Sequence, residues 1–130
     1  MNTKNKKIIP IHNGLERIRI FTIKEIFDWI DNNPKRIYMI VDEYKINLKR
    51  AKIFHKKGLI CVNCGVCGEF FALESDKGGG IHLDLYGFID TEEVLLTIDH
   101  IIAKSKGGPN EYINYQIMCK LCNELKADND

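Results

Sequence analysis

Four cysteines stand in two pairs whose spacing suits a tetrahedral metal ion. Cys61-Val-Asn-Cys64 and Cys119-Lys-Leu-Cys122 both have the Cys-x-x-Cys spacing with which one turn of chain presents two thiolates to Zn²⁺. The second pair opens a predicted helix, whose N-terminal dipole favours thiolates. Cys64-Gly-Val-Cys67 has the same spacing, so Cys67 could replace Cys61. We predict a structural zinc site on Cys61, Cys64, Cys119 and Cys122, with this one alternative left open.

A second group of polar residues suits a harder cation. Asp99-His100 follows a short apolar strand, and Asn123 lies one helical turn beyond Cys119. A carboxylate and an amide oxygen, with positions left for water and phosphate, suit Mg²⁺ or Mn²⁺ better than Zn²⁺. His100 is then free to take a proton from an attacking water. Because neighbouring strand residues point to opposite faces, we expect the strand to end at Asp99 so that both residues can serve one site.

Several elements must fold to bring these residues together, because 54 residues separate the two cysteine pairs. That is far more than the ~15–20 residues of a simple zinc ribbon, so we expect an inserted fold. Alternating apolar residues predict strands at 69–74, 81–88 and 94–98, the last of which delivers Asp99. Before them, the patterns predict a strand ending near Thr22, a helix to about Asp31 that begins with a capping box, a strand at 36–41, and a basic helix at 47–57 that Gly58 ends.

Charge is divided unevenly along the chain, although its net value is only +1. Residues 1–57 carry 14 Lys and Arg against 6 Asp and Glu, a net charge of +8. Residues 58–130 carry 5 against 12, a net charge of −7. A basic N-terminal half favours contact with phosphates, and an acidic half can hold cations. The alternative interpretation of the Lys-rich stretch is a solvated surface without a partner.

Together these residues resemble the HNH endonuclease family over about residues 58–127. The resemblance is closest to the small, zinc-stapled members that phages or mobile elements often encode. It implies an α+β chain built on a ββα-metal motif, stapled by a four-cysteine zinc site and preceded by an N-terminal α/β extension. The matching segments are Cys61-x-x-Cys64-Gly, Asp99-His100-Ile-Ile-x-Lys104-Ser-Lys106-Gly107-Gly108, Asn114-Tyr-Gln and Cys119-x-x-Cys122-Asn123-x-x-Lys126.

The resemblance also implies a role for each matching residue. Asp99 and Asn123 would bind the catalytic Mg²⁺ or Mn²⁺, although the third motif position is His in the family's name. His100 would be the general base that activates water, and Asn114 would orient its imidazole through a hydrogen bond. Zinc would fasten the hairpin to the helix. Phosphates beside the scissile bond would contact Lys104, Lys106 and Lys126.

Length and composition place these features in one small protein. With 130 residues and 45% hydrophobic content, the chain suits a single globular domain. Within it we predict a basic extension over 1–57 packed on a nuclease core over 58–130. No apolar run approaches the ~18–20 residues of a membrane span. Five cysteines favour a reduced, cytoplasmic setting, which is the host cytoplasm if a phage encodes the chain.

Two functions from different classes follow from these patterns. The first is a metal-dependent endonuclease that hydrolyses DNA phosphodiester bonds, with DNA as its partner and no membrane. The alternative is a non-catalytic zinc module that binds nucleic acid through its basic half. RNA as substrate, nicking against double-strand cutting, and formation of a homodimer all stay open on the sequence.

Overall fold

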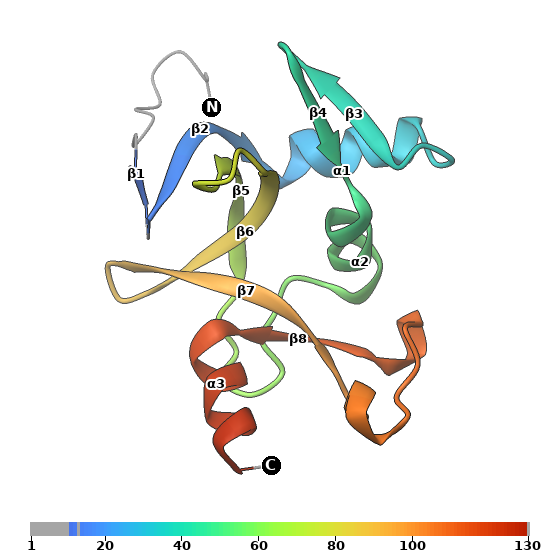
Figure 1. Ribbon diagram of the computed structural model, residues 1–130, viewed down its shortest axis with the longest axis vertical. Coiled ribbons are helices and arrows are strands. Elements are labelled where there is room, and N and C mark those ends of the chain that lie inside the picture. The colour runs from blue at the N-terminus through green and yellow to red at the C-terminus, as the bar shows by residue number, and fades with distance from the viewer. Residues whose placement is uncertain (1–10, 13, 130) are drawn as a thin grey trace.

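A bent antiparallel sheet runs through the molecule (Figure 1). The structure is a computed structural model that describes residues 11–12 and 14–129. The hairpin strands predicted at 69–74 and 81–88 are confirmed as neighbours in this sheet. In spatial order the strands are β1 (Ile11–His12), β2 (Leu15–Thr22), β5 (Gly68–Ser75), β6 (Ile81–Ile89), β7 (Glu92–His100) and β8 (Tyr115–Cys119).

Local sequence signals explain where the helices begin and end. Helix α1 (Ile23–Asn32) starts with the predicted capping box, in which the Thr22 hydroxyl accepts from the Glu25 backbone and the Glu25 carboxylate accepts from the Thr22 backbone. Helix α2 (Lys49–Lys57) ends at Gly58, whose φ of 105° is open to glycine but strained for other residues. The remaining elements are the hairpin β3 (Tyr38–Val41) and β4 (Tyr44–Asn47), helix α3 (Lys120–Asn129), and the short 3-10 helices η2 (Lys104–Lys106) and η3 (Tyr112–Asn114).

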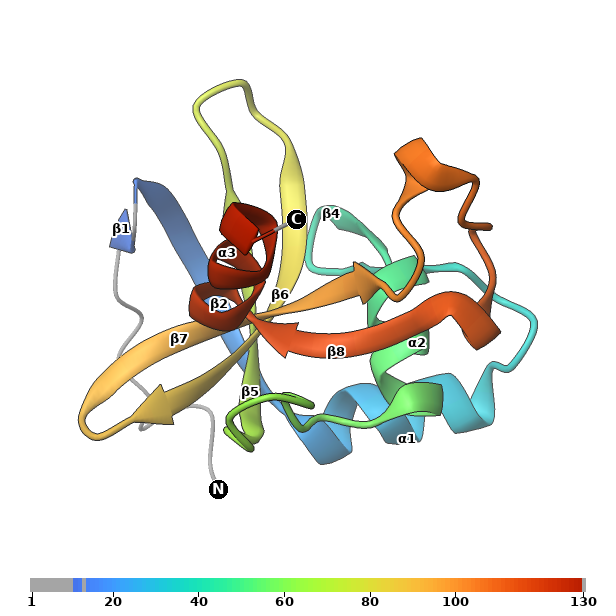
Figure 2. The ribbon, with the colours of Figure 1, turned by 90° about the horizontal axis from the view of Figure 1, so that it is seen from below.

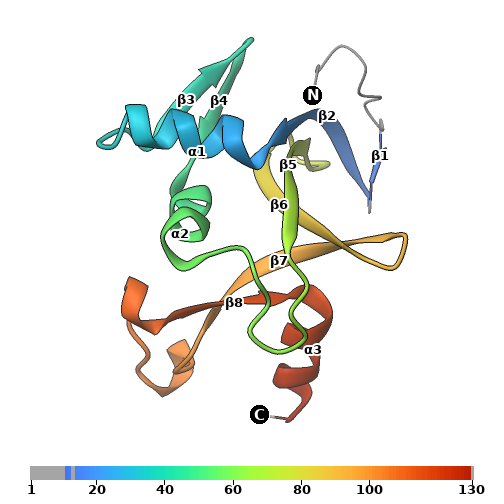
Figure 3. The ribbon, with the colours of Figure 1, turned by 180° about the vertical axis from the view of Figure 1, so that it is seen from behind.

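The apolar core lies between the sheet and the first two helices. Helix α2 buries Ala51 and Phe54 and packs against α1 and against strands β6, β7 and β8. Its lysines stay on the outer side, so the basic face and the apolar face of α2 are separated. Helix α3 packs against β7 and β8 at the other end of the sheet (Figures 2 and 3). The last sheet hairpin is therefore held between two helices.

A buried charge network fastens the N-terminal strand to the rest of the sheet. Arg17 on β2 is only 1% exposed, and its Nε donates to Glu74 Oε2 on β5 at 3.1 Å. Its other guanidinium nitrogens contact the Glu93 carboxylate on β7 at 2.8 and 3.2 Å. The Tyr86 hydroxyl donates to Glu74 Oε1 at 2.5 Å, and the guanidinium lies 4.8 Å from the Tyr86 ring centroid. Residues 15–22 are thus integral to the sheet.

Glu74 makes stability depend on pH in a direction that the structure sets. Burial raises the pKa of its carboxyl from the ordinary 4.5 to about 7, against the opposing hydrogen bonds from Tyr86 and Arg17. The folded chain therefore binds this proton more tightly than the unfolded chain does. Relative to Glu74→Gln, the native chain should lose on the order of 1–3 kcal/mol of unfolding free energy as pH rises from 4.5 to 7.

The measurement is urea unfolding of the native protein and of Glu74→Gln across that pH range, at a fixed zinc concentration. Comparing the two chains cancels pH effects from other groups, including the thiols. Parallel stability profiles for the native chain and Glu74→Gln would show that Glu74 binds its proton equally in both states.

Candidate active site and thiol cluster

The loop after α2 lies beside the junction of β8 and α3 (Figure 3). Four cysteine side chains, two from each segment, converge there. The Sγ atoms of Cys61, Cys64, Cys119 and Cys122 all lie within 4.8 Å of one another. Cys67 is outside the cluster, and its thiol donates to its neighbour Gly68 O at 3.4 Å. The cluster could hold a metal such as zinc, and it contains Cys61 rather than the alternative Cys67.

Hydrogen bonds of the backbone position the four cysteines independently of a metal ion. Val62 N donates to Ile117 O at 2.9 Å, which joins the first cysteine loop to β8. Gly65, with φ of 83°, closes the turn by donating to Cys61 O at 3.0 Å. Asn63 Nδ2 lies 3.2 Å from Cys122 Sγ, a donor placed to stabilise a thiolate. Four soft sulfur donors at this spacing fit tetrahedral Zn²⁺.

The thiols differ in how readily they ionise. At Cys61 burial alone would raise the pKa, but backbone hydrogen bonds from Cys64, Cys119 and Asn63 outweigh it and lower the pKa to about 6. Burial raises the pKa of Cys119 to about 12. A bound cation would stabilise all four thiolates together, so acid should oppose its binding.

Asp99 lies near the end of β7 and is held by two side chains. Gln116, directly opposite on β8, donates to Asp99 Oδ2 at 2.9 Å. Lys126 on α3 donates to the same oxygen at 2.6 Å and to His100 O at 3.0 Å. The Asp99 side chain is 12% exposed, so this carboxylate is fixed rather than freely solvated. Lys126, for which a phosphate contact is predicted, pairs with Asp99 in this structure.

Asn123 faces the same region from the second turn of α3. Its Nδ2 donates to Thr97 Oγ1 at 2.9 Å, and that hydroxyl donates to Met118 O at 2.7 Å. This chain of bonds sets the orientation of the amide, with its oxygen turned away from Thr97. A cavity of about 290 Å³ is lined by Ile98, Asp99, His100, Ala103, Lys104, Asn123, Lys126 and Ala127.

His100 is oriented by a residue that the sequence interpretation did not name. Its Nε2 lies 2.8 Å from Asn110 Oδ1, and its ring meets Tyr115 edge to face at 5.3 Å between centroids. An amide oxygen can only accept, so Nε2 donates, and in the neutral imidazole Nδ1 is then the acceptor. The expectation that the strand ends at Asp99 is wrong, because His100 still pairs with Tyr115. Asp99 and His100 nevertheless line one cavity.

Asn114 organises the loop between β7 and β8 rather than bonding to His100. Its side chain accepts from Ile102 N at 2.8 Å and donates to Ile102 O and Pro109 O, both at 3.0 Å. Gly108 packs so closely here that an added Cβ would lie 1.8 Å from Ile102 O. Asn114 and Gly108 therefore act on His100 only through the loop that carries Asn110. Lys104 and Lys106 stand exposed on η2, with Lys104 at the cavity.

Three positioning residues were missed, and two had a signal in the sequence. Thr97 precedes Asp99 by two positions, so both lie on one face of the strand. Gln116 could be found from the register of the hairpin once Asp99 was chosen. Asn110 sits in an irregular loop, where neither periodicity nor register places a side chain.

Comparison with known proteins now identifies the chain. The family model described as HNH endonuclease matches residues 64–129, about half of the sequence. The chain belongs to the HNH endonuclease family. The match starts at Cys64, so Cys61 and everything before it lie outside the shared family region. No curated protein and no solved structure matches the chain significantly. Among the described residues, every helix is too short or too polar to cross a bilayer.

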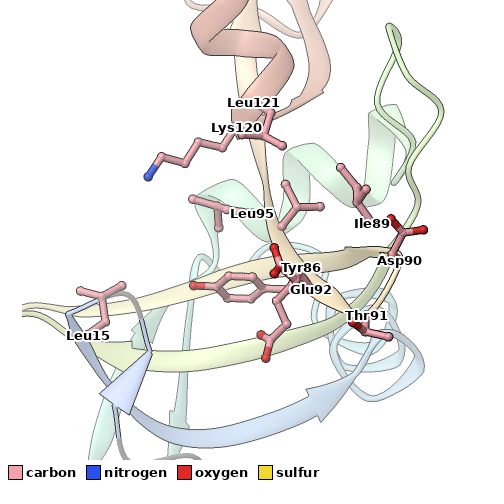
Figure 4. Close-up of a pocket in the computed structure, with 11 residues that line it drawn as sticks. Leu15, Tyr86, Ile89, Asp90, Thr91, Glu92, Leu95, Lys120 and Leu121 are labelled. Carbon is pink, nitrogen blue, oxygen red and sulfur yellow. The ribbon is translucent and has the colours of Figure 1, made fainter.

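A larger cavity of about 710 Å³ lies elsewhere on this HNH protein (Figure 4). It opens between the start of β2, the β6–β7 turn and the start of α3. Asp90 and Glu92 stand around it with Leu15 and Leu95, and Lys120 reaches over it from α3. Carboxylates at its rim would repel a nucleic-acid backbone, so its size alone does not make it the active site of an HNH protein.

The thiol cluster yields a matched pair of cysteine substitutions. Cys119→Ser removes a buried member of the cluster and should lower bound zinc well below about one equivalent per chain. Because metal binding is coupled to folding, Tm should fall by about 10 °C or more. Cys67→Ser is the control, since its thiol is exposed and outside the cluster. The measurements are the zinc content and the Tm of each variant. Equal zinc content in Cys119→Ser and Cys67→Ser would contradict a four-cysteine site.

Proposed function

We propose that this protein is a metal-dependent HNH endonuclease that hydrolyses DNA phosphodiester bonds. The observation that carries the proposal is one small cavity that Asp99, His100 and Asn123 line together. Under this proposal β7, β8 and α3 form the ββα-metal motif, and the four cysteines hold structural zinc. Membership of the HNH family supports nuclease activity, and the residues above supply a base and a cation site.

His100 is the general base in this proposal. Asn110 holds Nε2 as a donor, so Nδ1 can accept a proton from the attacking water. The edge-to-face contact with Tyr115 restricts rotation of the imidazole. The base is therefore held in one tautomer and one orientation before the substrate arrives, as general base catalysis requires.

Asp99 and Asn123 are the proposed ligands of a divalent cation. One carboxylate and one amide oxygen suit Mg²⁺ or Mn²⁺, with remaining positions for water and phosphate oxygens. Such a cation, when bound, supplies Lewis-acid stabilisation of charge on the phosphodiester. Gln116 and Thr97 fix the orientation of the two ligands through 2.9 Å hydrogen bonds to Asp99 and Asn123. Lys104 and Lys106 stand exposed nearby, where they can contact flanking phosphates.

Substitution of His100 tests the assignment directly. His100→Ala should lower the rate of plasmid nicking in Mg²⁺ or Mn²⁺ by about 10²- to 10⁴-fold, the usual contribution of a general base. Zinc content and Tm should be unchanged, because His100 lies outside the thiol cluster. His82→Ala is the matched control, since His82 bonds to Asp76 in a distant turn.

Two results would contradict the assignment. Equal nicking by the native chain and His100→Ala would exclude His100 as the base. DNA binding without cleavage in either metal would favour the non-catalytic zinc module instead. EDTA should stop cutting, and Zn²⁺ together with Mg²⁺ should restore it, whereas Zn²⁺ alone should restore only the fold.

Asn110 offers a separate test of the orientation of the base. Asn110→Ala should lower kcat by about tenfold, the lower end of what partners of functional histidines contribute. Asn110→Asp keeps an acceptor oxygen at Nε2 and should retain more activity than the alanine variant. The measurement is a pH–rate profile of each variant on one DNA substrate. Equal rates for Asn110→Ala and the native chain would remove Asn110 from the mechanism.

A further inference from the structure

A groove of about 450 Å³ runs beside the proposed active site, between α2 and the η3 turn. Figures 1 and 2 show α2 next to the segment that leads into β8. All of α2 precedes the HNH region that starts at residue 64, so the groove lies where residues before that region meet the loop between β7 and β8. Its volume is in the range of small-ligand pockets.

The groove is apolar inside and basic at its rim. Ile37, Ile53, Tyr112 and Tyr115 contribute apolar and aromatic surface, while Lys49 and Lys52 contribute ammonium groups. Lys56, on the same side of α2, places its Nζ 4.4 Å from the centroid of the Tyr112 ring. Tyr112 remains 39% exposed, and Ile37 remains 53% exposed. A ligand for this groove should combine a flat apolar group with negative charge.

Two residues connect the groove to His100. Asn110 lines the groove, and its Oδ1 is the atom 2.8 Å from His100 Nε2. Tyr115 also lines the groove and packs its ring edge to face against the imidazole. The groove is therefore adjacent to the Asp99 cavity, and His100 lies between the two sets of lining residues. A polymer bound across His100 would enter both.

We propose that this groove binds one unpaired base of the DNA strand next to the scissile phosphate, an inference that rests on the proposed nuclease function. Paired bases in a duplex expose only their edges, because their flat faces are stacked on neighbouring bases, and neither edges nor phosphates would fill the apolar floor. An unstacked base presents a flat face to Tyr112, and its flanking phosphates meet Lys49 and Lys52. Glu111 at the rim would repel a phosphate but can accept a bond from a base amino group.

The proposal assigns the protein a substrate preference. DNA that offers an unpaired base beside the cut, such as a mismatched, branched or single-stranded segment, should be favoured over a continuous duplex. The basic helix α2 thereby contributes a specificity subsite in addition to general attraction for phosphates.

Binding of single-stranded DNA tests the groove without requiring cleavage. The probe is a fluorescent oligonucleotide with 2-aminopurine at successive positions, mixed with zinc-loaded full-length chain in the absence of Mg²⁺ and Mn²⁺. Tyr112→Ala should weaken binding by about tenfold and relieve the quenching of one 2-aminopurine, because one stacking contact is lost. Tyr112→Phe should restore both. Tyr38→Ala is the matched control, because Lys45 lies 4.3 Å from the centroid of that 40% exposed ring outside the groove.

Cleavage gives a second, independent measurement. Once the cut site of the native chain is mapped, an abasic nucleotide is placed at each flanking position. One position should lower kcat/KM by about tenfold in the native chain and have no effect in Tyr112→Ala. Unchanged DNA binding by Tyr112→Ala, or equal sensitivity of both chains to abasic positions, would overturn the groove assignment. Base quenching that depends on Tyr112 in a protein that never cuts would support the groove and refute the nuclease.

Discussion

The convergence of four thiols is the constraint on which the rest of this structure depends. Two of them come from a loop before the central hairpin, and two from the junction of β8 and α3. Their meeting places α3 against β7 and β8, and α3 carries Asn123 and Lys126 to Asp99. A metal held by these four thiols would cross-link the segment from η2 to α3 to the loop before β5, and it would add to the stability that burial provides.

A second constraint holds the opposite end of the sheet. The Arg17 guanidinium is buried against two carboxylates, from β5 and β7, and the β5 carboxylate also accepts from Tyr86. A buried cation without these partners would be strongly destabilising, so β2 is bound to one register by its charges as well as by its backbone. These contacts join β2, from the basic 1–57 half, to β5 and β7 of the acidic 58–130 half within the six-stranded sheet.

Local features of the fold could be predicted from sequence, and long-range polar contacts could not. The capping box at Thr22, the glycine that ends α2, and the β5–β6 hairpin follow from signals within a few residues. The short strand β4 was not predicted, and neither was burial of Asp84 and Tyr86 on the polar face of β6. Arg17 covers the Tyr86 ring and lies 57 residues before its partner Glu74, and Asp84 pairs with Arg50 at 3.2 Å. Periodicity contains no information on such pairings.

The same limit applies to the candidate site: its chemical groups could be predicted from sequence, but the contacts that position them could not. Residue type, spacing and the family resemblance marked Asp99, His100 and Asn123, whereas only the folded loop shows that Asn110 and not Asn114 meets the imidazole. Lys126 shows why residue type is insufficient. One oxygen of Asp99 cannot be neutralised by this ammonium and by a divalent cation at once, because the two positive charges would repel at contact distance. A cation at Asp99 must therefore use the other carboxylate oxygen or displace Lys126. In the second case Lys126 would be free to reach the phosphate contact that the family resemblance implies for it.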